Sequence, residues 1–337
     1  MSRHFLALCA AGAFVLSACP ANAQIEGIPR YEHIIVIIAE NHGFDQIKDN
    51  PNAPNINTLA QKFGLATQYF GVVHPSKANY IAMIAGKTFG IHDDKPYVDH
   101  TISDRSLVDQ LKERNLTWKG YYENFPADDP GAVFSPKQGN PLYVSKHNAF
   151  INFKNVQDDP AFADKIVGLD RLSPDLANGQ FPNYAHIIPN LCNDMHGMDP
   201  GAGVDKNCEF DDTADTGIIA RGDKVIGDLV AKIIASPVWS KPGNVAIVIT
   251  WDENEDGHNV KGKGCCGFDP NSPANFGGGH VPTIVVTNNG PRGVTDDTPH
   301  NHYSLLRTTE AAFGITEHLN LANHPDVHTM VKLFAVP

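Results

Sequence analysis

The stretch HIIVIIAEN, residues 33–41, decides the class of fold. Six apolar residues, 34–39, stand in a row, and an unbroken β-branched run of this kind predicts a strand that is buried on both faces, as in a parallel sheet. The run stops at Glu40 and Asn41. Because the carboxyl ends of strands in open α/β sheets border the ligand crevice, we expect Glu40 and Asn41 to lie at the rim of a site.

A second run, NVAIVITW at residues 244–251, has the same character and stops at Asp252 and Glu253. Two neighbouring carboxylates repel each other unless a cation or a proton lies between them. Two buried strands that end in oxygen ligands therefore predict a site for a hard divalent metal ion. The alternative is a solvated acidic loop, since Glu255 and Asp256 follow directly.

Strand and helix signals alternate along the rest of the chain, which predicts an α/β protein with a mostly parallel central sheet and helices on both faces. Further strands are expected at residues 67–73, 117–122, 184–188 and 281–287. Helices are expected at residues 55–63 with Asn55 as N-cap, 77–85 after Ser76, 107–114 after Ser106, 216–235 and 304–313. Residues 124–160 and 254–280 are rich in loop-forming residues.

Residues 1–23 predict a secretory signal peptide, with Arg3 at its positive start, an apolar core at residues 5–18 and a cleavage site after Ala23. The core is too short to span a bilayer. Lipid attachment at Cys19 is the alternative. Either route exports the protein, so we expect a secreted or periplasmic protein, with residues 24–337 as one catalytic domain that has no integral membrane segment.

The net charge is −12, from 26 Lys and Arg against 38 Asp and Glu, and this acidic balance argues against a nucleic-acid partner. An anionic substrate would need a metal ion or a local group of cations at the site. Beyond residue 23, an even number of cysteines in an exported chain favours disulfides. We expect Cys192 to pair with Cys208, which leaves Cys265 and Cys266 as a vicinal bridge or as two thiols; crossed pairing and a zinc site are the alternatives.

Ser76 is the candidate nucleophile, because it lies between a predicted strand and a predicted helix, in the N-cap position. The amides at a helix N-terminus bind anions, and a metal ion at the same place would lower the pKa of the hydroxyl. The alternative is a serine that only caps the helix.

Histidines and a carboxylate supply further candidates. Asp194 and His196 are two residues apart, so on an extended loop both can point the same way, which suits metal ligation or general acid catalysis. The alternative for them is a polar loop closed by a disulfide. His280 and His302 precede a predicted strand and the last helix, and His147 lies in a loop; ordinary surface or core histidines are the alternative.

Six segments carry a resemblance to a known family. They are AENHGFD (39–45), HPSKANY (74–80), PNLCNDMHG (189–197), TWDE (250–253), GHVP (279–282) and HYSLL (302–306). In this order the chain resembles the bacterial phosphoesterase family of secreted acid phosphatases and phospholipases C, a branch of the alkaline phosphatase superfamily. The resemblance implies a three-layer α/β/α sandwich and a serine or threonine that is phosphorylated during turnover.

The resemblance also implies roles for residues. Glu40 and Asn41 resemble the first metal ligands, Ser76 the nucleophile and a further ligand, and Asp252 and Glu253 the late acidic pair. The catalytic histidines would be His196 and His280, and groups that hold phosphate would be His74, Lys77, His147, Asp194 and His302. Asp252-Glu253 stands where two-metal alkaline phosphatases have an Asp-His pair, so we expect one divalent ion rather than two.

These observations predict a metal-dependent acid phosphatase that hydrolyses phosphate monoesters through a phosphoserine intermediate. Its partner would be a small phosphorylated substrate or a phospholipid head group. A phospholipase C that cleaves phosphodiesters on the same fold is the first alternative, and an exported binding protein for anions or metals is the second. A sulfatase would need a C/S-x-P-x-R type sequence, which does not occur near Ser76.

Overall fold

A computed structural model describes residues 24–210, 216–255, 264–267 and 277–335 of the chain. The predicted first strand is β1 (His33–Ala39), and residues 34–39 are fully buried in it, so the interpretation as a strand covered on both faces is confirmed. β1 lies inside an eight-stranded sheet with the order β11-β2-β10-β9-β1-β8-β4-β7.

The sheet is mostly parallel, as predicted. β1 pairs in parallel with β8 (Tyr184–Ile188) on one side and with β9 (Val245–Trp251) on the other, and β4 and β7 continue the parallel part. β10 is antiparallel to both β9 and β2, and β11 is parallel to β2. The bounds of these outer strands are β2 (Gly64–Ala66), β4 (Trp118–Tyr122), β7 (Ile166–Gly168), β10 (Thr283–Thr287) and β11 (Val294–Asp296).

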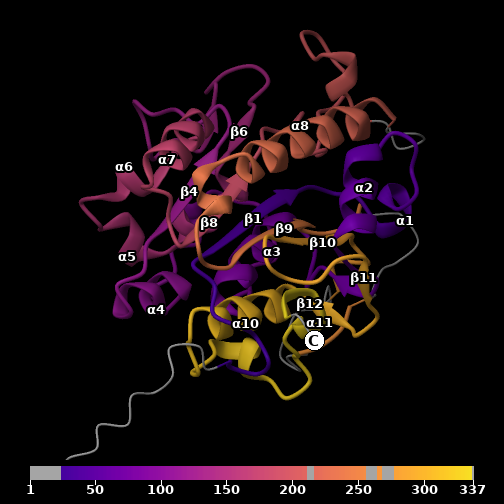
Figure 1. Ribbon diagram of the computed structural model, residues 1–337. Coiled ribbons are helices and arrows are strands. Elements are labelled where there is room, and N and C mark those ends of the chain that lie inside the picture. Colours follow the sequence, from indigo (N-terminus) through magenta and orange to yellow (C-terminus); the bar gives the residue numbers. More distant parts are fainter. Residues whose placement is uncertain (1–23, 211–215, 256–263, 268–276, 336–337) are drawn as a thin grey trace, which may run out of the picture.

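Helices cover both faces of the sheet, which gives three layers (Figure 1). One face carries α2 (Pro54–Lys62) and α8 (Thr216–Ile234), with α7 (Leu172–Asn178) and α9 (Pro237–Ser240). The other carries α3 (Ser76–Ala85), α4 (Leu107–Glu113), α10 (His302–Ala312) and α11 (Val331–Phe334). The α/β/α class is therefore confirmed.

Short elements fill the connections. They are the helices α1 (Phe44–Ile47), α5 (Lys154–Gln157) and α6 (Phe162–Lys165), the paired strands β3 (Tyr69–Phe70) with β12 (His300–Asn301) and β5 (Phe134–Ser135) with β6 (Tyr143–Val144), and the 3₁₀ turns η1 (Tyr97–Asp99), η2 (Ser145–His147), η3 (Phe150–Asn152), η4 (Leu169–Arg171), η5 (Lys206–Cys208) and η6 (Asn320–Asn323).

The register of β1 against β9 decides where the site lies. Ala39 pairs with Trp251 at the last position of both strands, and the Asp252 amide donates to the Ala39 carbonyl at 3.1 Å. Glu40 and Asp252 therefore leave the sheet side by side, at its carboxyl edge.

Two predicted helix starts differ from the structure by one residue. α2 begins at Pro54, and Asn55 is not its cap. Asp223 of α8 accepts hydrogen bonds from the amides of Asn55 and Ile56, so a carboxylate from another helix satisfies the donors that a local cap would have taken. α3 begins at Ser76 itself, with Pro75 before it.

The strand expected at residues 67–73 is reduced to β3. The Asn79 side chain accepts hydrogen bonds from the amides of Val72 and Val73 at 2.8 and 3.1 Å. A side chain of α3 therefore takes the backbone donors that a longer strand would have used for pairing.

Both disulfides are formed. Cys192 pairs with Cys208, as preferred from the sequence, and Cys265 pairs with Cys266 as a vicinal bridge. The predicted signal peptide and Cys19 lie outside the described residues. Among the described residues, none of the helices has both the length and the apolar composition needed to cross a bilayer.

A partly buried network of charged side chains connects Glu26, near the start of the described chain, with α10 and the segment that follows it. His318 contacts Glu310 of α10 at 2.7 Å and Glu26 at 3.3 Å, and Arg307 pairs with Glu26 at 2.7 Å. Burial alone would lower the pKa of His318, but the hydrogen bond and the charge of Glu310, with the charge of Glu26, raise it overall.

We predict that His318→Gln destabilises the protein more at pH 6 than at pH 9. A histidine whose pKa is higher in the folded than in the unfolded state stabilises the fold fully below its ordinary value, 6.5, and loses this contribution as the pH rises through the folded value. Urea unfolding at both pH values measures the difference. The exposed His92→Gln is the control, and an equal loss at both pH values would contradict the prediction.

Candidate active site

Glu40 is the centre of the site. β1 ends in a sharp turn at Asn41, whose φ of 54° lies in the left-handed region that asparagine tolerates. The fully buried Glu40 side chain accepts hydrogen bonds from the Tyr80 hydroxyl at 2.6 Å and the Ser76 hydroxyl at 3.1 Å. His147 Nε2 lies 3.1 Å from the same carboxylate. Glu40 thus connects the sheet, α3 and η2.

Ser76 Oγ lies between two carboxylates, 3.1 Å from Glu40 Oε2 and 3.2 Å from Glu253 Oε1. A hydroxyl has one proton, so it can satisfy only one of these oxygens at a time. The other contact requires a protonated carboxyl or a cation nearby. The hydroxyl of Ser76 therefore does not act as a local helix cap, which was the alternative for this residue.

Two further residues of α3 belong to the site and were missed from the sequence. Asn79 donates to Glu253 Oε2 at 3.2 Å, and Tyr80 donates to Glu40. They follow Ser76 by three and four residues, the spacing that places side chains on one face of a helix. This spacing was the signal that could have found them.

Asp252 and Glu253, the acidic pair after β9, have different partners. Glu253 forms an ion pair with His74 at 2.8 Å, in addition to its contacts with α3. Asp252 Oδ1 accepts from the Asn41 amide at 3.4 Å. His302 is buried behind this pair, and its Nε2 donates to the Asp252 carbonyl at 2.6 Å. His302 therefore supports the backbone that carries Asp252.

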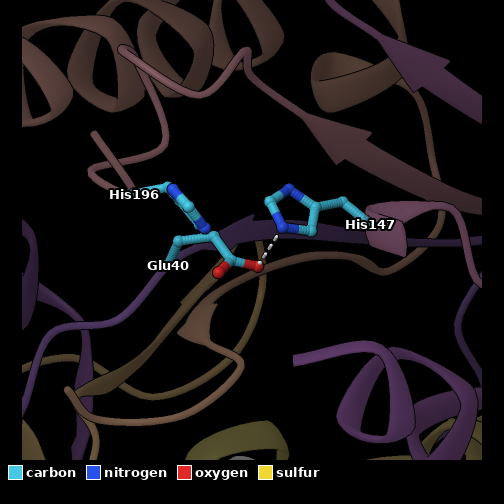
Figure 2. A group of neighbouring side chains, drawn as sticks. All are labelled: Glu40, His147 and His196. Carbon is cyan, nitrogen blue, oxygen red and sulfur yellow. Dashed lines mark ion pairs between the residues drawn. The ribbon is translucent and has the colours of Figure 1, made fainter. Parts of the chain in front are cut away.

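The loop after β8 brings Asp194 and His196 to Glu40. The Glu40 amide donates to the Asp194 carbonyl at 2.7 Å, and Asp194 Oδ1 accepts from the His196 amide at 2.8 Å. His147 Nδ1 lies 3.4 Å from Asp194 Oδ2. Ligand atoms of Glu40, His147 and His196 all lie within 4.8 Å of one another, and Figure 2 shows the three side chains converging.

A lysine that the sequence did not single out reaches this cluster. Lys146 Nζ contacts Asp94 Oδ2 at 2.9 Å and His196 Nε2 at 3.1 Å. The predicted phosphate ligand Lys77 points elsewhere: its ammonium donates to the Lys95 carbonyl, and its backbone amide donates to Asp94. At the start of α3, the backbone amide of Lys77 is therefore already hydrogen-bonded to the Asp94 carboxylate.

His280 stands on another wall of the site region. Its ring is stacked on Phe44 with centroids 4.4 Å apart and is tilted against Phe70. Its Nε2 lies 3.0 Å from the Thr67 carbonyl. These contacts hold the ring between aromatic side chains, whereas His147 contacts Glu40 and a ring nitrogen of His196 lies within 4.8 Å of the Glu40 carboxylate.

The electrostatics of the site favour a bound positive charge. Burial, and then the negative charge of Asp252, raise the pKa of Glu40 well above its usual value. Burial, and then Glu253, likewise raise the pKa of Asp252, and burial raises the pKa of Asp194 and Glu253. Four buried carboxyl groups thus resist ionising together.

The residues present fit a divalent cation. Within the described residues, the buried Asp252 Oδ2 has no hydrogen-bond partner, and Asp194 Oδ2 has only the 3.4 Å ion-pair contact with His147; a buried carboxylate oxygen left without a hydrogen bond is costly. Oxygen donors of Glu40, Asn41, Ser76, Asp252 and Glu253 suit a hard ion, and the imidazoles of His147 and His196 suit zinc or a related metal. Of the predicted metal ligands, Glu40 lies in a group of possible ligand atoms with His147 and His196, and Ser76 lies between Glu40 and Glu253.

Comparison with known proteins identifies the family. The model of the Phosphoesterase family matches residues 48–316, so the chain belongs to this family, and the expected class of enzyme, a hydrolase of phosphoric esters, is confirmed. A phosphatidylinositol-3-phosphatase of Mycobacterium tuberculosis is 27% identical over 301 residues, which cover 89% of this chain and 83% of that protein. A phosphate-repressible acid phosphatase of Penicillium chrysogenum is 27% identical over 308 residues and 91% of this chain.

The chain spans 64% of that Penicillium protein and 60% of a probable acid phosphatase of Kluyveromyces lactis. Among solved structures, a protein of the alkaline phosphatase superfamily from Vibrio parahaemolyticus matches with a TM-score of 0.53 and 13% identity, over 86% of this chain and 68% of that one. The lipoteichoic acid synthase LtaP of Listeria monocytogenes matches with a TM-score of 0.55 and 11% identity, over 93% of this chain and 79% of that one. These likenesses confirm the fold.

We predict that a divalent cation stabilises the protein against unfolding and that Asp252→Asn reduces this stabilisation. A ligand at one hundred times its Kd adds about 2.7 kcal/mol. In a chelator, the variant should melt at a higher temperature than the parent by about 2 °C, because one repelling charge is gone and about 1 kcal/mol shifts Tm by roughly 2–4 °C in domains of somewhat smaller size. Added divalent ions should raise its Tm less than that of the parent.

Thermal unfolding with a chelator and with Mg²⁺, Mn²⁺, Ca²⁺ or Zn²⁺ tests this expectation. Asp128→Asn, at an exposed position, is the matched control and should respond to metal as the parent does. A Tm of the parent that no divalent ion changes would contradict the assignment of a metal site.

Proposed function

We propose that this member of the Phosphoesterase family is an exported, metal-dependent acid phosphatase that hydrolyses phosphate monoesters through a phosphoserine at Ser76. The observation that carries the proposal is the buried hydroxyl of Ser76 held between Glu40 and Glu253. A serine that serves only the fold does not need two carboxylate acceptors. The names of the fungal relatives, which are acid phosphatases, support the activity and the acid optimum.

The first step is attack of Ser76 Oγ on phosphorus. Its proton passes to Glu40 or Glu253, which already accept from it, while the bond between phosphorus and the leaving oxygen breaks. Water then attacks the phosphoserine, inorganic phosphate leaves and the hydroxyl regains a proton. A divalent ion, held by Glu40, Asn41, Asp252 and Glu253, would lower the pKa of the serine hydroxyl and offset charge on the transferring phosphoryl group.

The leaving oxygen takes its proton from Nε2 of His196 in this proposal, once the Lys146 ammonium has turned from this nitrogen to the substrate phosphate. Burial, and then the charge of Lys146, lower the pKa of His196 to about 4, so its protonated share grows as the medium becomes more acidic. His196 is preferred to His280 because it lies at Glu40, whereas Nε2 of His280 faces the Thr67 carbonyl. Lys146, beside His196, holds an oxygen of the substrate phosphate.

Export rests on residues 1–23, whose pattern is that of a signal peptide and whose removal leaves residues 24–337 as the catalytic domain. A phospholipase C activity on phosphodiesters remains the alternative for the same site. Equal turnover of a phosphocholine diester and a chromogenic monoester by the purified enzyme would overturn the monoester proposal.

We predict that Ser76→Ala lowers kcat on a chromogenic phosphomonoester by at least about 10⁴-fold, because the phosphorylated intermediate cannot form. The parent, quenched in acid after brief incubation with a ³²P-labelled monoester, should carry label on Ser76, located by peptide mapping. Ser240→Ala, on the exposed end of α9, is the control and should behave as the parent. Retained turnover in Ser76→Ala, with the label on another residue, would remove the proposed nucleophile.

We also predict that Lys146→Met lowers kcat/KM by about 10–100-fold and weakens competitive inhibition by inorganic phosphate by a similar factor, since a hydrogen bond to a charged group contributes about 1.5–3 kcal/mol. Lys146→Arg should keep most of both. Lys95→Met, at an exposed lysine, is the matched control. Unchanged phosphate inhibition in Lys146→Met would show that Lys146 does not bind the phosphate.

A further inference from the structure

The loop that carries His196 also builds one wall of a cavity of about 390 Å³. Asn41 and His196 line this cavity, so it opens directly onto the candidate active site. Its volume lies in the lower part of the range of small-molecule pockets, about 300–1,000 Å³. The proposed reaction, with Ser76 on one side of phosphorus, leaves this cavity for the alcohol part of the ester.

The wall is built before any substrate binds. Met198 exchanges backbone hydrogen bonds with the 208–210 segment: its amide donates to the Cys208 carbonyl at 2.8 Å, and the Phe210 amide donates to its carbonyl at 2.8 Å. The Cys192–Cys208 disulfide ties the same two segments together. The bridge and the paired backbone therefore fix Met198 and Phe210 next to His196.

Besides Asn41 and His196, the cavity is lined by the polar Asn140, by apolar side chains and by one carboxylate. Pro141, Leu191, Met198 and Phe210 give it an apolar surface. Asp199 is its one carboxylate, and no Lys or Arg occurs among the side chains that line it in the described part of the chain. The nearby cation, Lys146, is paired with Asp94 and faces His196, on the side of the phosphate.

We propose that this cavity is the leaving-group pocket and that it selects phosphate monoesters whose alcohol is uncharged and partly apolar, of the size of an aryl group or a nucleoside. Alcohols that carry further phosphates meet Asp199 without a compensating cation, and like charges that approach this way repel. The proposal rests on the proposed phosphatase function and adds its class of substrate.

The test compares kcat/KM of the purified full enzyme for three phosphate monoesters: adenosine 5′-monophosphate, adenosine 3′,5′-bisphosphate and glycerol 3-phosphate, a small polar ester. The parent should prefer the nucleoside monophosphate to the bisphosphate by at least about tenfold. Asp199→Lys should reduce this preference about tenfold, because the sign of the charge at the pocket is reversed. Phe210→Ala should reduce the preference for the nucleoside monophosphate over glycerol 3-phosphate by about 5–20-fold, through lost apolar contact.

Asp164→Lys and Phe134→Ala, both at exposed positions that do not line the cavity, are the matched controls and should leave both preferences as in the parent. Hydrolysis of the bisphosphate as fast as of the monophosphate, or variants at Asp199 and Phe210 that change no preference, would overturn the pocket proposal while the phosphatase function stands. Failure of the proposed function would look different: none of the three esters would be hydrolysed, or Ser76→Ala would be as active as the parent.

Discussion

The candidate site depends on the parallel pairing of β1 with β9, because this pairing brings the carboxylates that follow the two strands close together. The matched ends at Ala39 and Trp251 place Glu40 beside Asp252 and Glu253, in a region that the sheet and its helices close to water. Burying ionised carboxylates without compensation costs several kcal/mol for each group. The fully buried apolar strands beneath the site offset that cost, so the core maintains a site that is unfavourable by itself.

The central part of this arrangement could be predicted from the sequence because its signals are local. An apolar run that ends in a carboxylate identifies both a buried strand and the residue at its end, which is how Glu40 and Asp252 were found. Ser76 was also found from a local signal, its position between a predicted strand and a predicted helix. In the structure it is the first residue of the helix and not its cap. The even number of cysteines favoured disulfides, and the pair Cys192–Cys208 was preferred because it closes a polar loop, although crossed pairing stayed open.

The remainder could not be predicted, since it depends on the paths of loops. Lys146 reaches His196 only because η2 and the loop after β8 lie side by side in the fold. No pattern in the sequence predicts that two segments 50 residues apart come into contact. The cap of α2 by Asp223 is of the same kind, since a carboxylate 168 positions after Asn55 replaces a local donor–acceptor pair. Tyr80 differs: its helical spacing from Ser76 was visible, but a tyrosine on an apolar helix reads as a core residue.

The distribution of charge links the site to its surroundings. Around Glu40, carboxylates outnumber cationic side chains. Lys146 lies near this group, held by contacts with Asp94 and His196. An incoming phosphate adds further negative charge, which a metal ion and this lysine compensate in the proposed mechanism. Such compensation is limited to one small volume, because the neighbouring cavity offers Asp199 and apolar side chains instead. In the proposed mechanism, the imbalance that calls for a cation at the phosphate therefore also favours neutral groups in the rest of the substrate.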